Sequence, residues 1–137
     1  MDIFGHTLTI IQLTQFFIAL FLGICFLQSG LDKVFDYWGN LDWLNQHFGN
    51  SMLKGIVPPM LIIITVLELG GGALCLISCY DLFFNAENGL ILYGFCLCAI
   101  ALTALFFGQR MAKDYEGASI LVIYFILTML GLLTFSF

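Results

Sequence analysis

Residues 56–79 read IVPPMLIIITVLELGGGALCLISC, and Glu68 is the only charged residue among these 24. About 20 apolar residues in a helix are enough to cross the hydrocarbon core of a bilayer. Pro58 and Pro59 fall in the first turn, where their missing N–H groups cost little. The stretch therefore predicts a transmembrane helix. A carboxyl group at that depth is a candidate functional group by default.

The rest of the chain shares this apolar character. Of its 137 residues, 61% are hydrophobic and 9% are charged, and the mean hydropathy is +1.04. Three more apolar segments, at about 10–31, 89–107 and 118–135, are also long enough to span a membrane. Lipid cannot satisfy unpaired backbone groups, and no segment alternates with a period of two, so all four should be helices. We predict an all-α fold, an integral membrane four-helix bundle that forms one membrane domain over residues 1–137.

The connection between the first two spans, about residues 32–55, is the only long one. Its apolar residues recur at helical spacing, and both tryptophans of the chain, Trp38 and Trp43, lie within it. Aromatic side chains of this kind collect at membrane–water boundaries. We therefore predict a short amphipathic helix at 41–48 that lies in the interface. Asn40 is its expected N-cap, and Gly49 is expected just after its end.

The four basic residues predict the topology. Lys33 and Lys54 flank the first connection, and Arg110 and Lys113 lie in the third, so all four fall on one side of a four-span protein. The positive-inside rule places that side in the cytoplasm and both termini opposite to it. In a bacterium this describes a multi-pass protein of the inner (cytoplasmic) membrane with periplasmic termini. The first span lacks a basic leader and a small-residue cleavage site, so we expect it to be retained.

The side chains that share a helical face with Glu68 are small or polar. They are Leu61, Thr65, Gly72, Cys75 and Cys79. Together with the glycines at 70–72, they would let neighbouring helices approach closely, so Glu68 should face the bundle interior or another subunit. Measured from the basic side, Gly23 and Thr128 should lie level with Glu68, and neither is a cation. Because burial disfavours a charged carboxylate, we expect Glu68 to be neutral.

Two interpretations of Glu68 follow. In the first, Glu68 is a functional acid that exchanges protons or binds a ligand. In the second, it is a neutral group that donates one hydrogen bond to a carbonyl or to a partner protein. A second candidate site is the polar cluster of Gln28, Ser29 and Lys33 beside Arg110. It is either an ordinary helix end with a snorkelling lysine or a site for a lipid head group or a quinone carbonyl.

The sequence predicts no metal site. Cys75 and Cys79, four residues apart, offer only two ligands, which is too few for a convincing metal site. A redox role for the pair is a minor alternative. His6 and His47 are expected near opposite faces of the membrane, so they should not share a metal. The net charge of −5, without any basic patch, argues against a nucleic-acid partner.

The order of these features resembles the DoxX/DoxD-like membrane protein family. The resemblance rests on Phe26-x3-Gly30-x2-Lys33, the amphipathic aromatic connection, and Glu68 followed by Gly71 and Gly72. Members are small four-helix membrane proteins, named after a subunit of a thiosulfate:quinone oxidoreductase. The resemblance implies an accessory, non-catalytic subunit of a larger respiratory or quinone-linked complex. Its expected partners are membrane lipid and the other subunits, and a quinone or a bound lipid is the only ligand it suggests.

Two other functions stay open at this point. One is a small proton-coupled transporter that works as an oligomer. Exporters of the small multidrug resistance type also have one membrane-embedded glutamate, although theirs is on the first span. The other is a quinone-reactive oxidoreductase subunit in which Glu68 is the catalytic residue. No cofactor motif is present to supply the electrons for that reaction, so a partner would have to provide them.

Overall fold

The computed structural model describes residues 2–3, 6–7, 9–85 and 89–136. Over these ranges the chain forms the helices α1 (Ile10–Phe35), α2 (Tyr37–His47), α3 (Val57–Asn85), α4 (Gly89–Met111) and α5 (Tyr115–Leu133), followed by the 3-10 turn η1 (Thr134–Ser136). A small antiparallel hairpin of β1 (Asp2–Ile3) and β2 (His6–Thr7) precedes α1. Four helical segments are long and apolar enough to cross a membrane. The predicted all-α four-helix architecture is therefore confirmed, and its apolar surfaces contact lipid.

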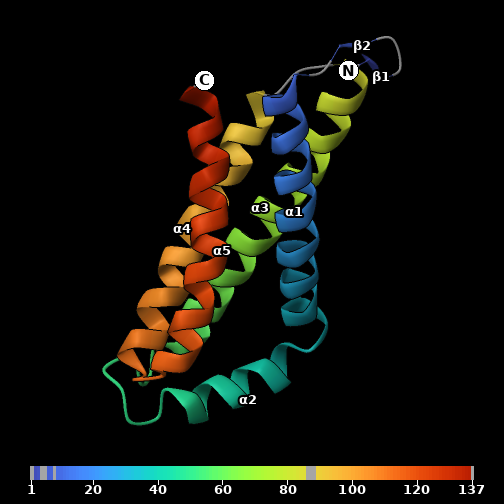
Figure 1. Ribbon diagram of the computed structural model, residues 1–137. Coiled ribbons are helices and arrows are strands. Elements are labelled where there is room, and N and C mark those ends of the chain that lie inside the picture. The colour runs from blue at the N-terminus through green and yellow to red at the C-terminus, as the bar shows by residue number, and fades with distance from the viewer. Residues whose placement is uncertain (1, 4–5, 8, 86–88, 137) are drawn as a thin grey trace.

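The helix α3 is the central element of the bundle. It packs along both α1 and α4, whereas α5 packs mainly on α4 and meets α1 over a short length only. Figure 1 shows the N- and C-terminal ends of the bundle together, with α2 at the opposite end. The connections that carry the four basic residues therefore share one end of the molecule, as predicted from the sequence.

The spanning helices are longer than predicted. The start of α1 at Ile10 agrees with the prediction and is fixed by a capping box: the Gln12 backbone N–H donates to Thr9 Oγ1 (3.1 Å), and the Thr9 N–H donates to Gln12 Oε1 (3.0 Å). At their other ends, however, α1 continues to Phe35, α3 to Asn85 and α4 to Met111. The prediction counted only uninterrupted apolar residues, and the helices continue into the polar flanks.

The helix α2 exists but begins earlier than predicted. It starts at Tyr37, separated from α1 by the single residue Asp36, and it ends at His47. Asn40 is not its N-cap. This residue lies inside the helix, where its side-chain amide donates to the Asp36 carbonyl (2.8 Å). Trp38 and Trp43 are exposed on α2, as expected for a helix in the membrane interface.

Glycines allow α3 to approach its neighbours closely. A Cβ atom on Gly72 would lie 2.5 Å from the backbone nitrogen of Leu27 in α1, and one on Gly94 in α4 would lie 3.0 Å from Cys75 Sγ. Any side chain at Gly72 would therefore push α1 and α3 apart. The small-residue stripe predicted on α3 is confirmed as a packing surface, and its glutamate is buried within the bundle.

The register between α1 and α3 determines which part of α1 lies beside Glu68. Gly30 lies against Leu69, and Gly23 lies against Leu76. Glu68 is thus level with the last turns of α1, about two turns from the position beside Gly23 that the sequence predicted. The first turns of α3 extend past the end of α1, and α2 turns beneath this extension (Figure 1).

Candidate functional site

Glu68 and Lys33 form an ion pair inside the membrane domain. The ammonium nitrogen of Lys33 lies 3.1 Å from Glu68 Oε1 and 3.2 Å from Oε2. The Glu68 side chain is 1% exposed and that of Lys33 is 16% exposed. The prediction that no cation lies level with Glu68 is therefore wrong, and this removes the reason given for expecting a neutral carboxyl. The prediction assumed the wrong register between α1 and α3. In the structure Glu68 lies near the end of α1 that carries Lys33.

The contacts of Lys33 explain how it is held at this depth. It donates to Ser29 Oγ at 2.9 Å and to Glu68 Oε2 at 3.2 Å, and the Ser29 carbonyl lies 3.5 Å away. A buried charge is tolerated when it is paired and hydrogen-bonded, and Lys33 meets both conditions. Ser29 belongs to the polar cluster predicted at the end of the first span, so this part of the cluster is assembled as a unit.

Two hydroxyl groups expected near Glu68 have other partners. Thr65 Oγ1 donates to the Leu61 carbonyl at 2.7 Å, and Thr128 Oγ1 donates to the Tyr124 carbonyl at 2.8 Å. Among the described residues, Glu68 Oε1 accepts no hydrogen bond, although the Lys33 ammonium lies close to it. One oxygen of the buried carboxylate thus keeps its capacity to accept a hydrogen bond.

A cavity of about 470 Å³ lies between α2, the first turns of α3 and the last turns of α4, and we call it the α2 cavity. Binding sites for small molecules in proteins fall in the range of about 300–1,000 Å³. Most of the walls are apolar, and the polar contributions come from Lys33, Asn40 and Gln109, with the indole of Trp43 beside them. The apolar lining includes Leu44, Phe48, Val57, Met60, Ile64, Leu105 and Phe107. The protrusion of α3 beyond α1 leaves this space, and α2 covers it.

A second, smaller space of about 240 Å³ lies on the other side of Glu68, and we call it the lateral cleft. Its lining combines residues of α1, α3, α4 and α5: Cys25, Phe26, Gln28, Ser29, Glu68, Leu102, Leu105, Leu121 and Tyr124. Gln28, predicted as a partner of Lys33, lines this cleft and not the α2 cavity. Arg110 lines neither space; its guanidinium carbon lies 4.4 Å from the centre of the Tyr115 ring. The structure therefore brings Lys33 and Glu68 together, places Gln28 beside them, and leaves Arg110 apart.

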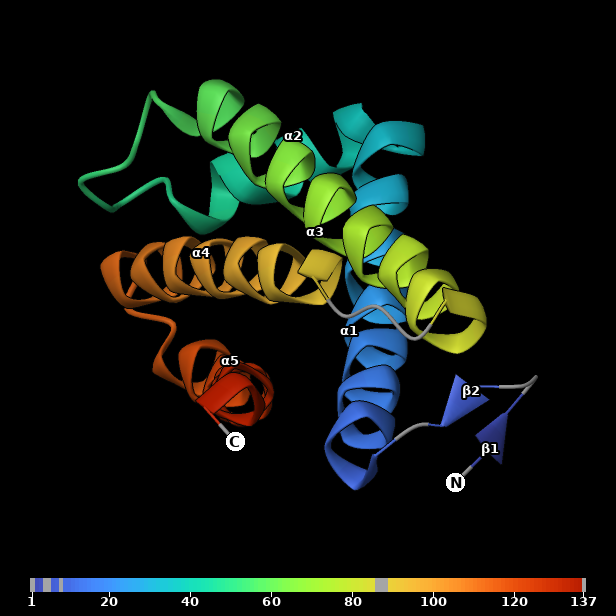
Figure 2. The same ribbon diagram turned by 90° about the horizontal axis from the view of Figure 1, so that it is seen from above.

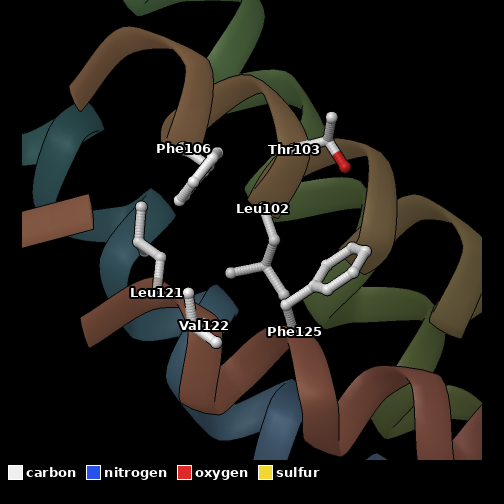
Figure 3. A pocket seen from close by; sticks show the side chains of 6 residues that line it. All are labelled: Leu102, Thr103, Phe106, Leu121, Val122 and Phe125. Atoms are coloured by element: carbon white, nitrogen blue, oxygen red, sulfur yellow. The ribbon is translucent and has the colours of Figure 1, made fainter. Parts of the chain in front are cut away.

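A third space, of about 270 Å³ between α4 and α5, offers no polar recognition. Figure 3 shows Leu102, Thr103 and Phe106 of α4 facing Leu121, Val122 and Phe125 of α5 around it. Its one polar side chain, Thr103, donates its hydroxyl to the Ala99 carbonyl at 2.8 Å. An apolar space of this kind suits a lipid acyl chain.

No pattern in the sequence indicates the group that fastens α2 to the bundle. His47 Nε2 lies 2.8 Å from Gln109 Oε1 and 3.5 Å from Asp114 Oδ2, and its ring stacks on Trp43 with the centroids 4.6 Å apart. These contacts tie the end of α2 to the turn between α4 and α5. Trp43 and Gln109 also line the α2 cavity, and only the fold brings residues so distant in sequence together.

The cysteines are arranged differently from the pair considered in the sequence. Cys75 Sγ lies 3.8 Å from Cys98 Sγ, and Cys79 Sγ donates to the Phe16 carbonyl at 3.6 Å. Cys98 carried no signal in the sequence because its partner is on another helix. No group of three or more His, Cys, Asp or Glu residues within the described ranges is arranged to hold a metal ion.

Comparison of the chain with protein families, with curated proteins and with solved structures finds no match. The functional assignment therefore rests on the Lys33–Glu68 pair and the two spaces beside it.

Proposed function

We propose that this chain is an accessory membrane subunit of a larger, quinone-linked respiratory complex, and that its α2 cavity holds the quinone. The proposal includes a place in the bacterial inner membrane, with both termini periplasmic. The resemblance to the DoxX/DoxD-like family supports it, and so does the clustering of the basic connections at the end of the molecule that carries the cavity.

The α2 cavity is the observation that carries this proposal. A quinone has a flat apolar ring, an apolar tail and two carbonyl oxygens that accept hydrogen bonds. The cavity matches these with apolar walls and with donors on Lys33 and Gln109, whereas the amide of Asn40, which also lines it, already donates to the Asp36 carbonyl. Two N–H groups of Lys33 are bound at 2.9 and 3.2 Å, whereas its contact with the Ser29 carbonyl is long, at 3.5 Å. The third N–H is therefore available to a ligand at little cost.

An accessory role follows from the chemistry of the cavity. Ammonium, amide and indole groups bind and orient a quinone, but they are not redox centres. Electrons must therefore reach the quinone from a partner protein. Broad apolar surfaces on the spanning helices, including Phe17, Phe21, Ile123 and Ile126, are available to contact lipid or the helices of such a partner. In this proposal Lys33, which Glu68 holds in place, orients the ligand, and the partner performs the oxidation or reduction.

Photolabelling with a quinone analogue tests the proposal. The purified protein in lipid nanodiscs is irradiated with a ring-azido quinone, and the labelled residues are identified by mass spectrometry. We expect labels on Trp43, Met60 and Phe107, which line the α2 cavity. Competition by an unlabelled quinone should remove these labels.

A pair of glycine variants provides the control. Gly108 lines the α2 cavity, and a Cβ atom there would lie 3.5 Å from the Phe48 ring, so Gly108→Leu places its side chain in the cavity region. Gly89, at the other end of α4, has open space around it, so Gly89→Leu is the matched substitution. We expect Gly108→Leu to lower labelling by about tenfold or more, a loss of at least ~1.4 kcal/mol of binding free energy, and Gly89→Leu to leave it unchanged. Labels that lie elsewhere, or that survive Gly108→Leu, would overturn the proposed quinone site.

A further inference from the structure

The lateral cleft is lined by two polar side chains, Glu68 and Tyr124, that keep hydrogen-bonding capacity among the described residues, although the Lys33 ammonium lies 3.1 Å from Glu68 Oε1. Glu68 lines it with a carboxylate that is 1% exposed, and Oε1 of this group accepts no hydrogen bond within the described part of the chain. Tyr124 also lines the cleft, and its hydroxyl forms no hydrogen bond to another described residue. A buried acceptor left without a donor is costly. The cleft therefore offers an acceptor and a hydroxyl to a bound molecule.

The charge at this position selects the kind of donor. Lys33 already balances the charge of Glu68, at 3.1 and 3.2 Å from its two oxygens. A second cation would leave a net positive charge buried in the membrane domain, which is unfavourable. A neutral donor satisfies Oε1 without adding charge. Hydrogen-bond donation by a hydroxyl group fits this requirement.

The depth of the cleft limits the size and polarity of the molecule. Glu68 is 1% exposed and lies 11 residues inside α3, level with the last turns of α1, where Gly30 meets Leu69. A charged phospholipid head group would lose its hydration at that depth. The hydroxyl must therefore belong to a molecule that dissolves in the lipid.

We propose that the lateral cleft is a binding site for a neutral, membrane-soluble molecule that carries a hydroxyl group. The hydroxyl donates to Glu68 Oε1, and its oxygen accepts from the hydroxyl of Tyr124. The apolar part of the molecule lies against Phe26, Leu102 and Leu121 and extends into the bilayer. This site is separate from the α2 cavity, with which it shares Leu105 in its lining, and it does not depend on the proposed quinone site.

The cysteines of the chain provide a direct assay. Cys25 is half-buried and lines the lateral cleft, whereas Cys96 is exposed on α4 and does not line it. Purified protein in nanodiscs is treated with N-ethylmaleimide, and modification of each cysteine is followed by mass spectrometry. The probe is 4-dodecylphenol, and its methyl ether, which cannot donate a hydrogen bond, is the matched control ligand.

We expect 4-dodecylphenol to slow the modification of Cys25 at least about fivefold and to leave Cys96 unaffected. The methyl ether should give no protection at the same concentration. Tyr124→Phe should weaken protection several-fold, and the double variant Lys33→Met with Glu68→Leu, which keeps the charge balanced, should abolish it. If the double variant does not fold, Tyr124→Phe and the two ligands still decide the question. Equal protection by the phenol and its ether, or protection unchanged by Tyr124→Phe, would overturn the proposal.

The natural ligand can come from two sources, a reduced quinone or a lipid alcohol. Solvent extraction of the purified protein, followed by mass spectrometry, distinguishes them. We expect one of these two classes to be retained by the native protein and lost from the double variant. Retention of the same molecules by both would contradict the site.

Discussion

Lys33, in the last turns of α1, and Glu68, in the interior of α3, form an ion pair with nitrogen–oxygen distances of 3.1 and 3.2 Å. The pair lies between two spaces: Lys33 lines the α2 cavity and Glu68 lines the lateral cleft. It therefore joins two helices and also connects the two spaces. A ligand that draws either side chain toward itself changes the environment of the other.

Removing one partner of this pair should destabilise the protein strongly. Glu68→Leu leaves the Lys33 ammonium without a counter-charge in a largely buried position. Loss of one partner from a buried pair costs about 3–5 kcal/mol in soluble proteins, and the partial exposure of Lys33 favours the lower end. We expect a clear fall in the unfolding free energy, measured by titration of the purified protein in dodecylmaltoside with sodium dodecyl sulfate.

The double variant Lys33→Met with Glu68→Leu is the control for this prediction. It removes both charges together and replaces them with apolar side chains, so most of the stability should return. A double variant as unstable as Glu68→Leu alone would show that the two side chains do not act as a pair.

Close packing of α1 on α3 gives a second prediction. A Cβ atom on Gly72 would lie 2.5 Å from the Leu27 backbone nitrogen, which cannot move without shifting α1. Gly72→Ala should therefore destabilise the bundle by about 1–3 kcal/mol. The same substitution at Gly70 would place its Cβ 3.7 Å from Leu97 Cδ1, an ordinary contact, and should be neutral or slightly stabilising. Thermal unfolding of both variants checks the difference, and equal effects would contradict the packing.

Much of the fold could be predicted from composition and periodicity alone. The four spans, the interfacial helix and the inward position of Glu68 all follow from the apolar segments and from the residues that share a helical face. Helical periodicity fixes which side chains share a face of one helix. It does not fix how far two helices slide past each other, and this is why the Lys33–Glu68 pair was missed.

The two spaces beside the pair could not be predicted from the sequence for a related reason. The α2 cavity depends on where α1 ends, at Phe35, relative to the start of α3, at Val57. Gln109, which lines this cavity, contacts His47, and the two residues are 62 positions apart in the sequence. Contacts of this kind carry no local pattern, so only the assembled bundle shows them.

The contact between His47 and Gln109 gives a third prediction. His47→Ala removes the 2.8 Å contact with Gln109 and the ring that stacks on Trp43, so α2 should open more readily. A lost hydrogen bond of this type is worth about 1 kcal/mol, which corresponds to roughly fivefold faster hydrogen exchange. Exchange measured by mass spectrometry should rise in α2 and stay unchanged in α4.

Gln46→Ala is the matched control for α2. Gln46 is the neighbouring residue on the same helix, and its side chain is exposed. Its substitution should leave the exchange of α2 within error of the native protein. If His47→Ala and Gln46→Ala give the same exchange, then His47 does not hold α2 in place.

Purification in a gentle detergent tests whether the chain is an accessory subunit of a redox complex. The tagged protein is isolated from its native membrane, and mass spectrometry identifies the proteins and quinones that stay bound in constant ratio. We expect one or more redox proteins containing flavin, haem or iron–sulfur centres, together with a bound quinone that Gly108→Leu removes. A homodimer that carries neither a redox partner nor a quinone would contradict this expectation.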